Sequence, residues 1–136
     1  MREQPSTAEL IDAVAEFLRG EVMPALSGRL AFHARVAANV LDIVRRELTL
    51  GPAAEAAEAS RLVALLGRED EVEALNRELC ARIADASLDP HDPALIEHLW
   101  ATTLDTVAID QPNYATYRRA AANPNPAPRA ALNGDP

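Results

Sequence analysis

Apolar residues recur at helical spacing through almost the whole of this chain, and this pattern constrains the fold more than any other feature. The clearest example is GRLAFHARVAANVLDIVRREL, residues 28–48, whose apolar positions recur every four residues at Phe32, Val36, Val40 and Val44. Residues three or four apart share one face of a helix, whereas a strand requires alternation. No alternating run bounded by turn residues occurs. The pattern therefore predicts an all-α fold.

Capping residues and prolines indicate where the first helices begin and end. Ser6 and Glu9, three residues apart, fit a capping box at the start of the first helix. Pro24 is expected to end that helix near Met23, because proline disfavours helical geometry in the residue before it. Ser27 is the expected N-cap of the second helix.

Two further breaks are expected in the middle of the chain. Residues 50–52, Leu-Gly-Pro, combine a C-terminal stop with a new N-terminal start. The second helix is therefore predicted to end there, and a third to span about 52–66. Gly67 is expected to close the third helix, and Asp70 to open the fourth.

The last helices follow a turn at residues 89–93, DPHDP. Asp92 is the expected N-cap of a fifth helix that reaches about Ile109. A break at Pro112 precedes a short sixth helix. Five or six helices with short connections predict antiparallel neighbours packed as a bundle.

The end of the chain differs in composition from the rest. Residues 123–136, NPNPAPRAALNGDP, are rich in proline and polar residues and are expected to be disordered. Residues 1–122 are expected to form a single helical domain, because a chain of 136 residues usually contains one domain. The apolar content of 49% suffices for a core without disulfides or metals.

Charge and composition exclude several function classes. The formal net charge of −8 repels phosphate backbones, so nucleic acid is not an expected partner. The N-terminus lacks the apolar stretch of a signal peptide, and no run approaches the roughly 18 apolar residues of a membrane span. The single cysteine, Cys80, precludes an internal disulfide and fits a reducing, cytoplasmic compartment. Cys80 falls in the apolar stripe of the fourth helix and is expected to be buried and unreactive.

Three polar residues interrupt the predicted apolar faces of three helices. His33 lies among the valines of the second helix, Glu21 on the apolar face of the first, and Asn76 in the stripe of the fourth. Buried polar groups need partners, so we expect these residues and Arg29 to form one cluster in which His33 is buried and hydrogen-bonded. The cluster is either a set of paired structural groups or a polar pocket for a small ligand or a reaction.

A second group of polar residues suits a different role. Arg35, Asn39 and Arg46 follow the polar flank of the second helix, and Tyr114 and Tyr117 share a face of the last one. Guanidinium groups beside an amide suit a carboxylate or phosphate. The alternatives are a partner surface, a solvated face with internal ion pairs, and tyrosines that pack the last helix onto the bundle.

No motif of a known catalytic or cofactor site occurs. The histidines His33, His91 and His98 do not share a one-turn spacing, and His98 is expected on the polar face of the fifth helix, so no metal site is predicted. There is no P-loop, no glycine-rich dinucleotide turn and no G-x-S-x-G. No cofactor is predicted, and a non-enzymatic protein is favoured over an enzyme.

Three segments carry a resemblance: LSGRLAFHARVAANVL (26–41), ALNRELCARI (74–83) and DQPNYATY (110–117). With these segments the chain resembles, over about residues 3–121, a small bacterial domain family of unknown function. Members are typically encoded beside an aminoglycoside-phosphotransferase-like kinase and often an acyl-CoA dehydrogenase. The resemblance implies an all-α fold and an accessory or interaction role beside those enzymes. It implies no catalytic residues, and the sequence indicates no oligomeric state.

Overall fold

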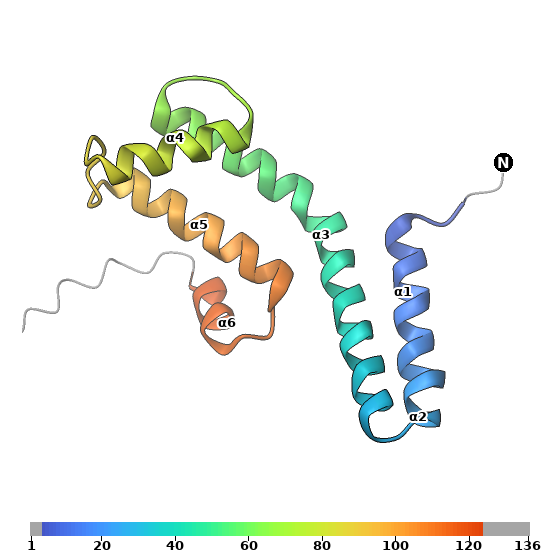
Figure 1. Ribbon diagram of the computed structural model, residues 1–136. Coiled ribbons are helices and arrows are strands. Elements are labelled where there is room, and N and C mark those ends of the chain that lie inside the picture. The colour runs from blue at the N-terminus through green and yellow to red at the C-terminus, as the bar shows by residue number, and fades with distance from the viewer. Residues whose placement is uncertain (1–3, 124–136) are drawn as a thin grey trace, which may run out of the picture.

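The computed structural model describes residues 4–123, in which all regular structure is helical (Figure 1). The all-α prediction is confirmed. The expected tail lies outside the described residues except for Asn123, which caps the last helix. The elements are α1 (Thr7–Phe17), a π-helical turn (Leu18–Val22), α2 (Met23–Ala25), α3 (Gly28–Leu66), α4 (Val72–Ala84), α5 (Pro93–Asp110) and α6 (Ala115–Ala122).

The first helical segment begins as predicted and ends later than predicted. The Ser6 hydroxyl accepts from the Glu9 amide, and the Glu9 carboxylate accepts from the Ser6 amide at 2.7 Å, so the capping box is present. Pro24 does not end the helix, which runs to Ala25. Proline lacks an N–H and its ring crowds the carbonyl four residues back. The wider π-helical turn before Pro24 accommodates both effects.

The predicted break at residues 50–52 is wrong, because α3 continues through Pro52 as one helix of 39 residues. A proline clashes with the Cβ of the residue before it, and Gly51 has no Cβ. Only the carbonyl of Leu48 then loses its intrahelical donor. The axis of α3 changes direction near its middle (Figure 1), as expected for a helix that contains a proline.

Capping at the later helices largely follows the sequence. Gly67 ends α3 in the left-handed conformation at φ 73°. The Asp92 carboxylate caps α5 by accepting from the Ala94 amide at 2.8 Å. The N-cap of α4 is Glu71 rather than the predicted Asp70, whose carboxylate is engaged by the Glu71 amide and by Arg68.

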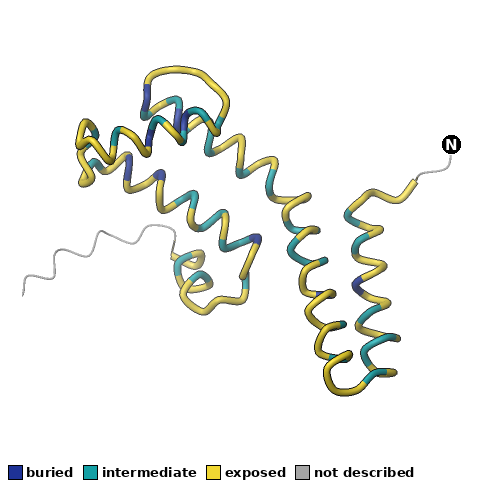
Figure 2. The backbone as a smooth tube through the Cα atoms, viewed as in Figure 1, coloured by how far each residue is buried: buried dark blue, intermediate teal, exposed yellow. Residues whose placement is uncertain are grey.

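The other helices pack along α3 in two groups (Figure 1). α1 runs antiparallel to the N-terminal half of α3 and forms a hairpin with it, while α4 and α5 pack on the C-terminal half. One hydrophobic core lies in this second group, and Figure 2 shows that buried residues gather there. Its buried members are all leucines: Leu62, Leu66, Leu75, Leu79 and Leu95.

The predicted apolar face of the hairpin does not lie between its helices. The only buried residues of the hairpin are Ala15 and Ala38, whereas Val36, Val40 and Val44 of the predicted face are exposed. Small side chains let two helices approach closely, so the alanines occupy the centre of the contact, and larger residues such as Leu18 and Leu41 are half-buried. The helical period predicted from the sequence is therefore correct, and the predicted direction of the apolar face is wrong.

The same error affects α4 and α5. Cys80 is exposed, which corrects the prediction that it is buried, whereas Leu75 and Leu79 of the same helix are buried. On α5, His98 is buried although it was expected on the polar face, and Trp100 is exposed. None of the helices within residues 4–123 is both long and apolar enough to cross a membrane.

Candidate functional site

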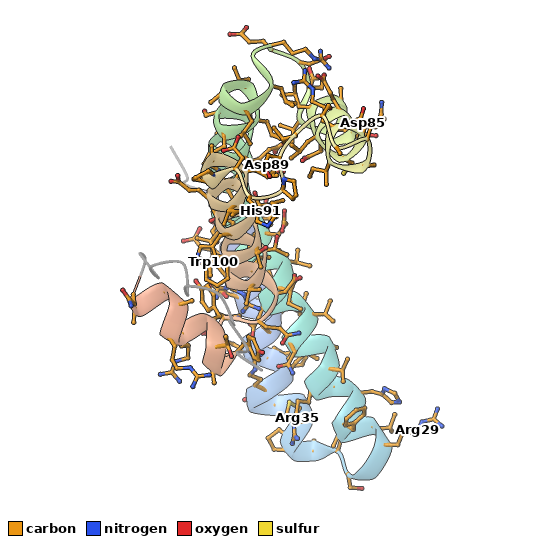
Figure 3. All side chains as sticks on the ribbon, turned by 90° about the vertical axis from the view of Figure 1, so that its left-hand side faces the viewer. Arg29, Arg35, Asp85, Asp89, His91 and Trp100 are labelled. Carbon is orange, nitrogen blue, oxygen red and sulfur yellow. The ribbon has the colours of Figure 1, made fainter. Side chains whose placement is uncertain are left out.

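The predicted cluster around His33 does not form. His33 is exposed, so the prediction that it is buried is wrong. Within residues 4–123, no hydrogen bond or ion pair joins His33 to Glu21 or Arg29, which are also exposed. The His33 ring instead meets Phe32 edge-on, with ring centroids 5.7 Å apart. Figure 3 shows Arg29 extending away from the helices at the end of the hairpin.

Asn76 belongs to a different part of the molecule. Its amide donates to Glu58 Oε1 at 2.8 Å and so joins α4 to the C-terminal half of α3. The 25 residues of α3 that separate positions 33 and 58 correspond to about 37 Å at the rise of an α-helix. Asn76 therefore cannot reach His33, because the two residues lie near opposite halves of α3.

The buried histidine of this protein is His98, on α5. Its side chain is 2% exposed, and its Nδ1 atom has no hydrogen-bond partner among residues 4–123. Burial lowers the pKa of His98, and the neighbouring positive charge of Arg61 lowers it further, while Glu58 acts in the opposite direction. His98 is thus held in its neutral form.

Polar contacts beside His98 connect α3 with α5. Arg61 Nη2 donates to Thr102 Oγ1 at 3.1 Å and lies 3.6 Å from Asp105 Oδ2. These contacts were not predicted from the sequence, although His98 follows Leu95 by three residues, a spacing that places both on one helical face. His91 lies apart, in the α4–α5 connection (Figure 3).

An acidic groove of about 320 Å³ lies between α3 and α5. Five carboxylates line it: Glu47, Glu55, Glu58, Asp105 and Asp110. In the described part of the chain, no three histidine, cysteine, aspartate or glutamate side chains come together in a way that could hold a metal ion.

A second groove, of about 420 Å³, gathers three residues of the predicted anion or partner surface. Asn39 and Arg46 line it from α3, and Tyr114 lines it from the connection between α5 and α6. Arg35 and Tyr117 do not line it. Two segments far apart in the sequence thus meet at this groove.

Two charged groups of the second groove, Arg46 and Asp42, are already engaged within the chain. Arg46 Nε donates to the Ile109 carbonyl at 2.5 Å, near the C-terminus of α5, where a cation is favourable. Asp42 accepts two hydrogen bonds from Arg19, at 2.5 and 3.2 Å. Asp110 adds a second carboxylate to the lining. The mixture of charges suits a small polar ligand better than a strongly charged anion.

Seven large apolar side chains of the hairpin are exposed to solvent, and we call this set the hairpin face. Its members are between 40% and 57% exposed: Leu10, Val14, Phe17, Val36, Val40, Val44 and Leu48. A smaller patch, which we call the α5 patch, consists of Ile96, Leu99 and Trp100. Single exposed apolar residues are ordinary, but seven of them on one hairpin indicate a candidate interaction surface.

The ion pairs across the hairpin show that the two apolar stripes share one side. Arg19 and Asp42 lie on one flank of the alanine contact and pair there. At 100° of rotation per residue, Val14 of α1 and Val44 of α3 both lie on the opposite flank of the alanine contact. Because the polar flanks meet on one side, the apolar flanks lie together on the other. The hairpin is therefore amphipathic as a unit.

The comparisons with known proteins identify one family. The family described as Domain of unknown function (DUF6285) matches residues 24–114, which include α3, α4 and α5 and leave α1 outside. Neither the curated proteins nor the solved structures contain a match to the chain.

Proposed function

Because the chain belongs to the DUF6285 family of domains of unknown function, we propose that it is a non-enzymatic interaction protein. The observation that carries this proposal is the hairpin face, seven large apolar side chains left at least 40% exposed on one amphipathic hairpin. Exposing such a surface is unfavourable in water unless another protein covers it.

The arrangement of the polar side chains supports the same proposal. A reaction site needs a nucleophile, acid or base whose partners converge on one place. Here Glu21, Arg29 and His33 are exposed at one end of α3, and Asn76 lies near the other end. The buried histidine, His98, lies among groups that join helices to one another.

The resemblance to a family encoded beside an aminoglycoside-phosphotransferase-like kinase and an acyl-CoA dehydrogenase supplies the first partners to test. We infer an accessory role in that system, in the bacterial cytoplasm. The test is co-expression of the tagged full chain with each enzyme, followed by affinity purification and mass measurement of the complex. Stoichiometric recovery of one enzyme is expected. Recovery of neither would overturn the assignment to that system.

Two charge variants locate the contact on the chain. Val40→Glu changes the hairpin face and Leu99→Glu changes the α5 patch, and both positions are exposed, so the fold is not expected to change. Loss of the enzyme in one variant and not in the other assigns the contact to that surface. Retention in both variants would contradict binding through apolar surfaces.

A second candidate function, small-ligand binding, rests on the second groove. It has the volume of a small-molecule site and is lined by Asn39, Arg46 and Tyr114. The probe is glycerol, a small uncharged polar molecule, titrated into labelled protein while amide shifts are recorded. Saturable shifts confined to residues 39–46 and 110–114, and weakened by Asn39→Leu, would support it. Shifts spread evenly over the surface would exclude binding of small polyols at this groove.

A further inference from the structure

We propose that the hairpin face binds a second copy of this chain, so that two hairpins form a four-helix dimer. The inference depends on the proposed function in one respect, namely that the hairpin face is a protein-binding surface. A helical hairpin with one apolar side is half of a four-helix bundle, and a twofold axis supplies the other half.

The area of the hairpin face matches what a dimer needs. Seven large apolar side chains, each about half exposed, leave on the order of 600 Å² of apolar surface. A standard interface takes roughly 800 Å² from each partner, including a polar rim. The hairpin face with its rim therefore suffices for a specific interface between two copies.

The spacing of the apolar residues on α3 is suited to pairing with itself. Val36, Val40 and Val44 follow one another at intervals of four residues and stay exposed, and Leu48 continues the row. Rows of this spacing form ridges on a helix, and in most four-helix bundles such ridges pack into grooves of the facing helix at a crossing angle of about +20°. Because a twofold axis presents the same ridge on both sides, each copy supplies the groove that the other fills.

The net charge of the chain predicts how the salt concentration changes the strength of the dimer. Each copy carries a formal net charge of −8, so two copies repel one another at a distance. The hairpin face itself is apolar, and its flanking ion pairs, such as Arg19–Asp42, are formed within one copy. Added salt screens the repulsion between copies and is expected to strengthen the dimer, whereas it would weaken a contact between this acidic chain and a basic partner.

The primary test is sedimentation equilibrium of the full chain over a wide concentration range at low and high salt. We expect a reversible monomer–dimer equilibrium whose dissociation constant falls as salt rises. A chain that remains monomeric at the highest concentration and salt would overturn the proposal. A mass that grows beyond the dimer would overturn it as well, since a twofold interface closes.

A matched pair of variants tests the surface. Val40→Glu places an unpaired carboxylate in the contact and is expected to raise the dimer dissociation constant by at least about 30-fold. Ile96→Glu introduces the same change at a position of equal exposure on the α5 patch and is expected to leave it unchanged. Equal effects of both variants would overturn the assignment. Circular dichroism verifies that each variant is folded.

Cross-linking provides a test that does not depend on weakening the contact. Cys80 is exposed and is first replaced, Cys80→Ser, so that it cannot react. Val40→Cys in that background is then expected to give a covalent dimer with a short bis-maleimide cross-linker, and Ile96→Cys is not. Linkage through position 96 instead of position 40 would contradict the proposed interface.

The outcomes separate this inference from the proposed function. A monomeric chain that still recovers an enzyme, and loses it on Val40→Glu, overturns the dimer and retains the interaction role. A dimer that recovers neither enzyme retains this inference and overturns the link to that system.

Discussion

The two halves of α3 carry similar apolar periodicity and yet differ in what they bury. Around the C-terminal half, five leucines from three helices form the core, and none is more than 7% exposed. Around the N-terminal half, only the alanines Ala15 and Ala38 are buried (Figure 2). The difference lies in the neighbours, because α4 and α5 pack on one half, whereas the other half packs on α1 and meets only the end of α5 and the connection that follows it.

A third helix determines whether a large apolar residue becomes part of a core. Two helices in contact bury one narrow seam, and alanines suffice to fill it. Where a third helix packs beside that seam, the residues that flank the seam become buried, as Leu62 does in the cluster with Leu75 and Leu95. The hairpin is therefore expected to open locally more easily than the C-terminal half unless another chain covers its face.

The largest expected effect comes from removing core volume. Leu75→Ala truncates a fully buried side chain and is expected to lower the free energy of unfolding by about 2–5 kcal/mol. Val40→Ala truncates a half-exposed side chain and is expected to cost less than about 1 kcal/mol at low protein concentration. Urea unfolding of both variants measures the difference. Equal losses would mean that the two halves are equally packed.

The second effect tests the alanine seam. Ala38 is fully buried, so Ala38→Leu must push α1 away from α3 and is expected to cost about 1–3 kcal/mol. Its neighbour Ala37 is exposed, and Ala37→Leu is the matched control. Hydrogen exchange is expected to accelerate in α1 and at the start of α3, while α4 keeps its protection. Acceleration throughout the chain would show that the halves unfold as one unit.

The third effect is a pH dependence confined to the C-terminal half. The folded pKa of His98 lies below its unfolded value near 6.5, so below that pH the unfolded chain binds more protons. The free energy of unfolding is not reduced by His98 above about pH 6.5, where His98 is neutral in both states. It decreases as the pH falls below 6.5 toward the lowered pKa, by at most about 1.4 kcal/mol per pH unit.

Denaturant unfolding between pH 7.5 and pH 5 measures this effect. His98→Gln is expected to flatten the slope below pH 6.5, whatever it does to the stability at neutral pH. His91→Gln changes a histidine whose side chain is 90% exposed and is expected to retain the slope. A slope that is unchanged in His98→Gln would assign the pH dependence to other groups.

The smallest effect concerns the polar flank of the hairpin. Asp42→Asn removes the ion pair with Arg19, whose side chain is 42% exposed, and is expected to cost about 0.2–1 kcal/mol. The cost is expected to shrink at high salt. Glu73→Gln removes the exposed pair with Arg77 and is expected to change the melting temperature less. A larger loss from Asp42→Asn than from Ala38→Leu would contradict a hairpin held by its alanine seam.

Much of the local structure was predictable because it depends on neighbours in sequence. The capping box at Ser6, the glycine cap at Gly67 and the aspartate cap at Asp92 each use atoms within three residues or a single backbone conformation. The break at Pro52 was predicted from the same kind of rule. It failed because glycine and proline are only enriched at helix ends: Gly51 has no Cβ to clash with the proline ring, so the helix continues with the loss of one hydrogen bond.

The candidate sites were predicted less well because they depend on which face of each helix meets another. The placement of His33 in an interior assumed that the valines around it face a neighbouring helix, and they face outward. Asn39, Arg46 and Tyr114 do meet at one groove, yet the sequence could not show that residues 110–114 return to the middle of α3.

The sequence by itself determined that this chain is helical and where most of its helices begin, since spacing and caps act over a few residues. The tertiary structure decided which side of each helix is inside. An amphipathic helix can turn its apolar stripe toward any helix of the same chain or toward another protein, and the period is the same in either case. In this protein the apolar stripe around Leu62 packs against α4 and α5, and the stripe along Val40 faces outward.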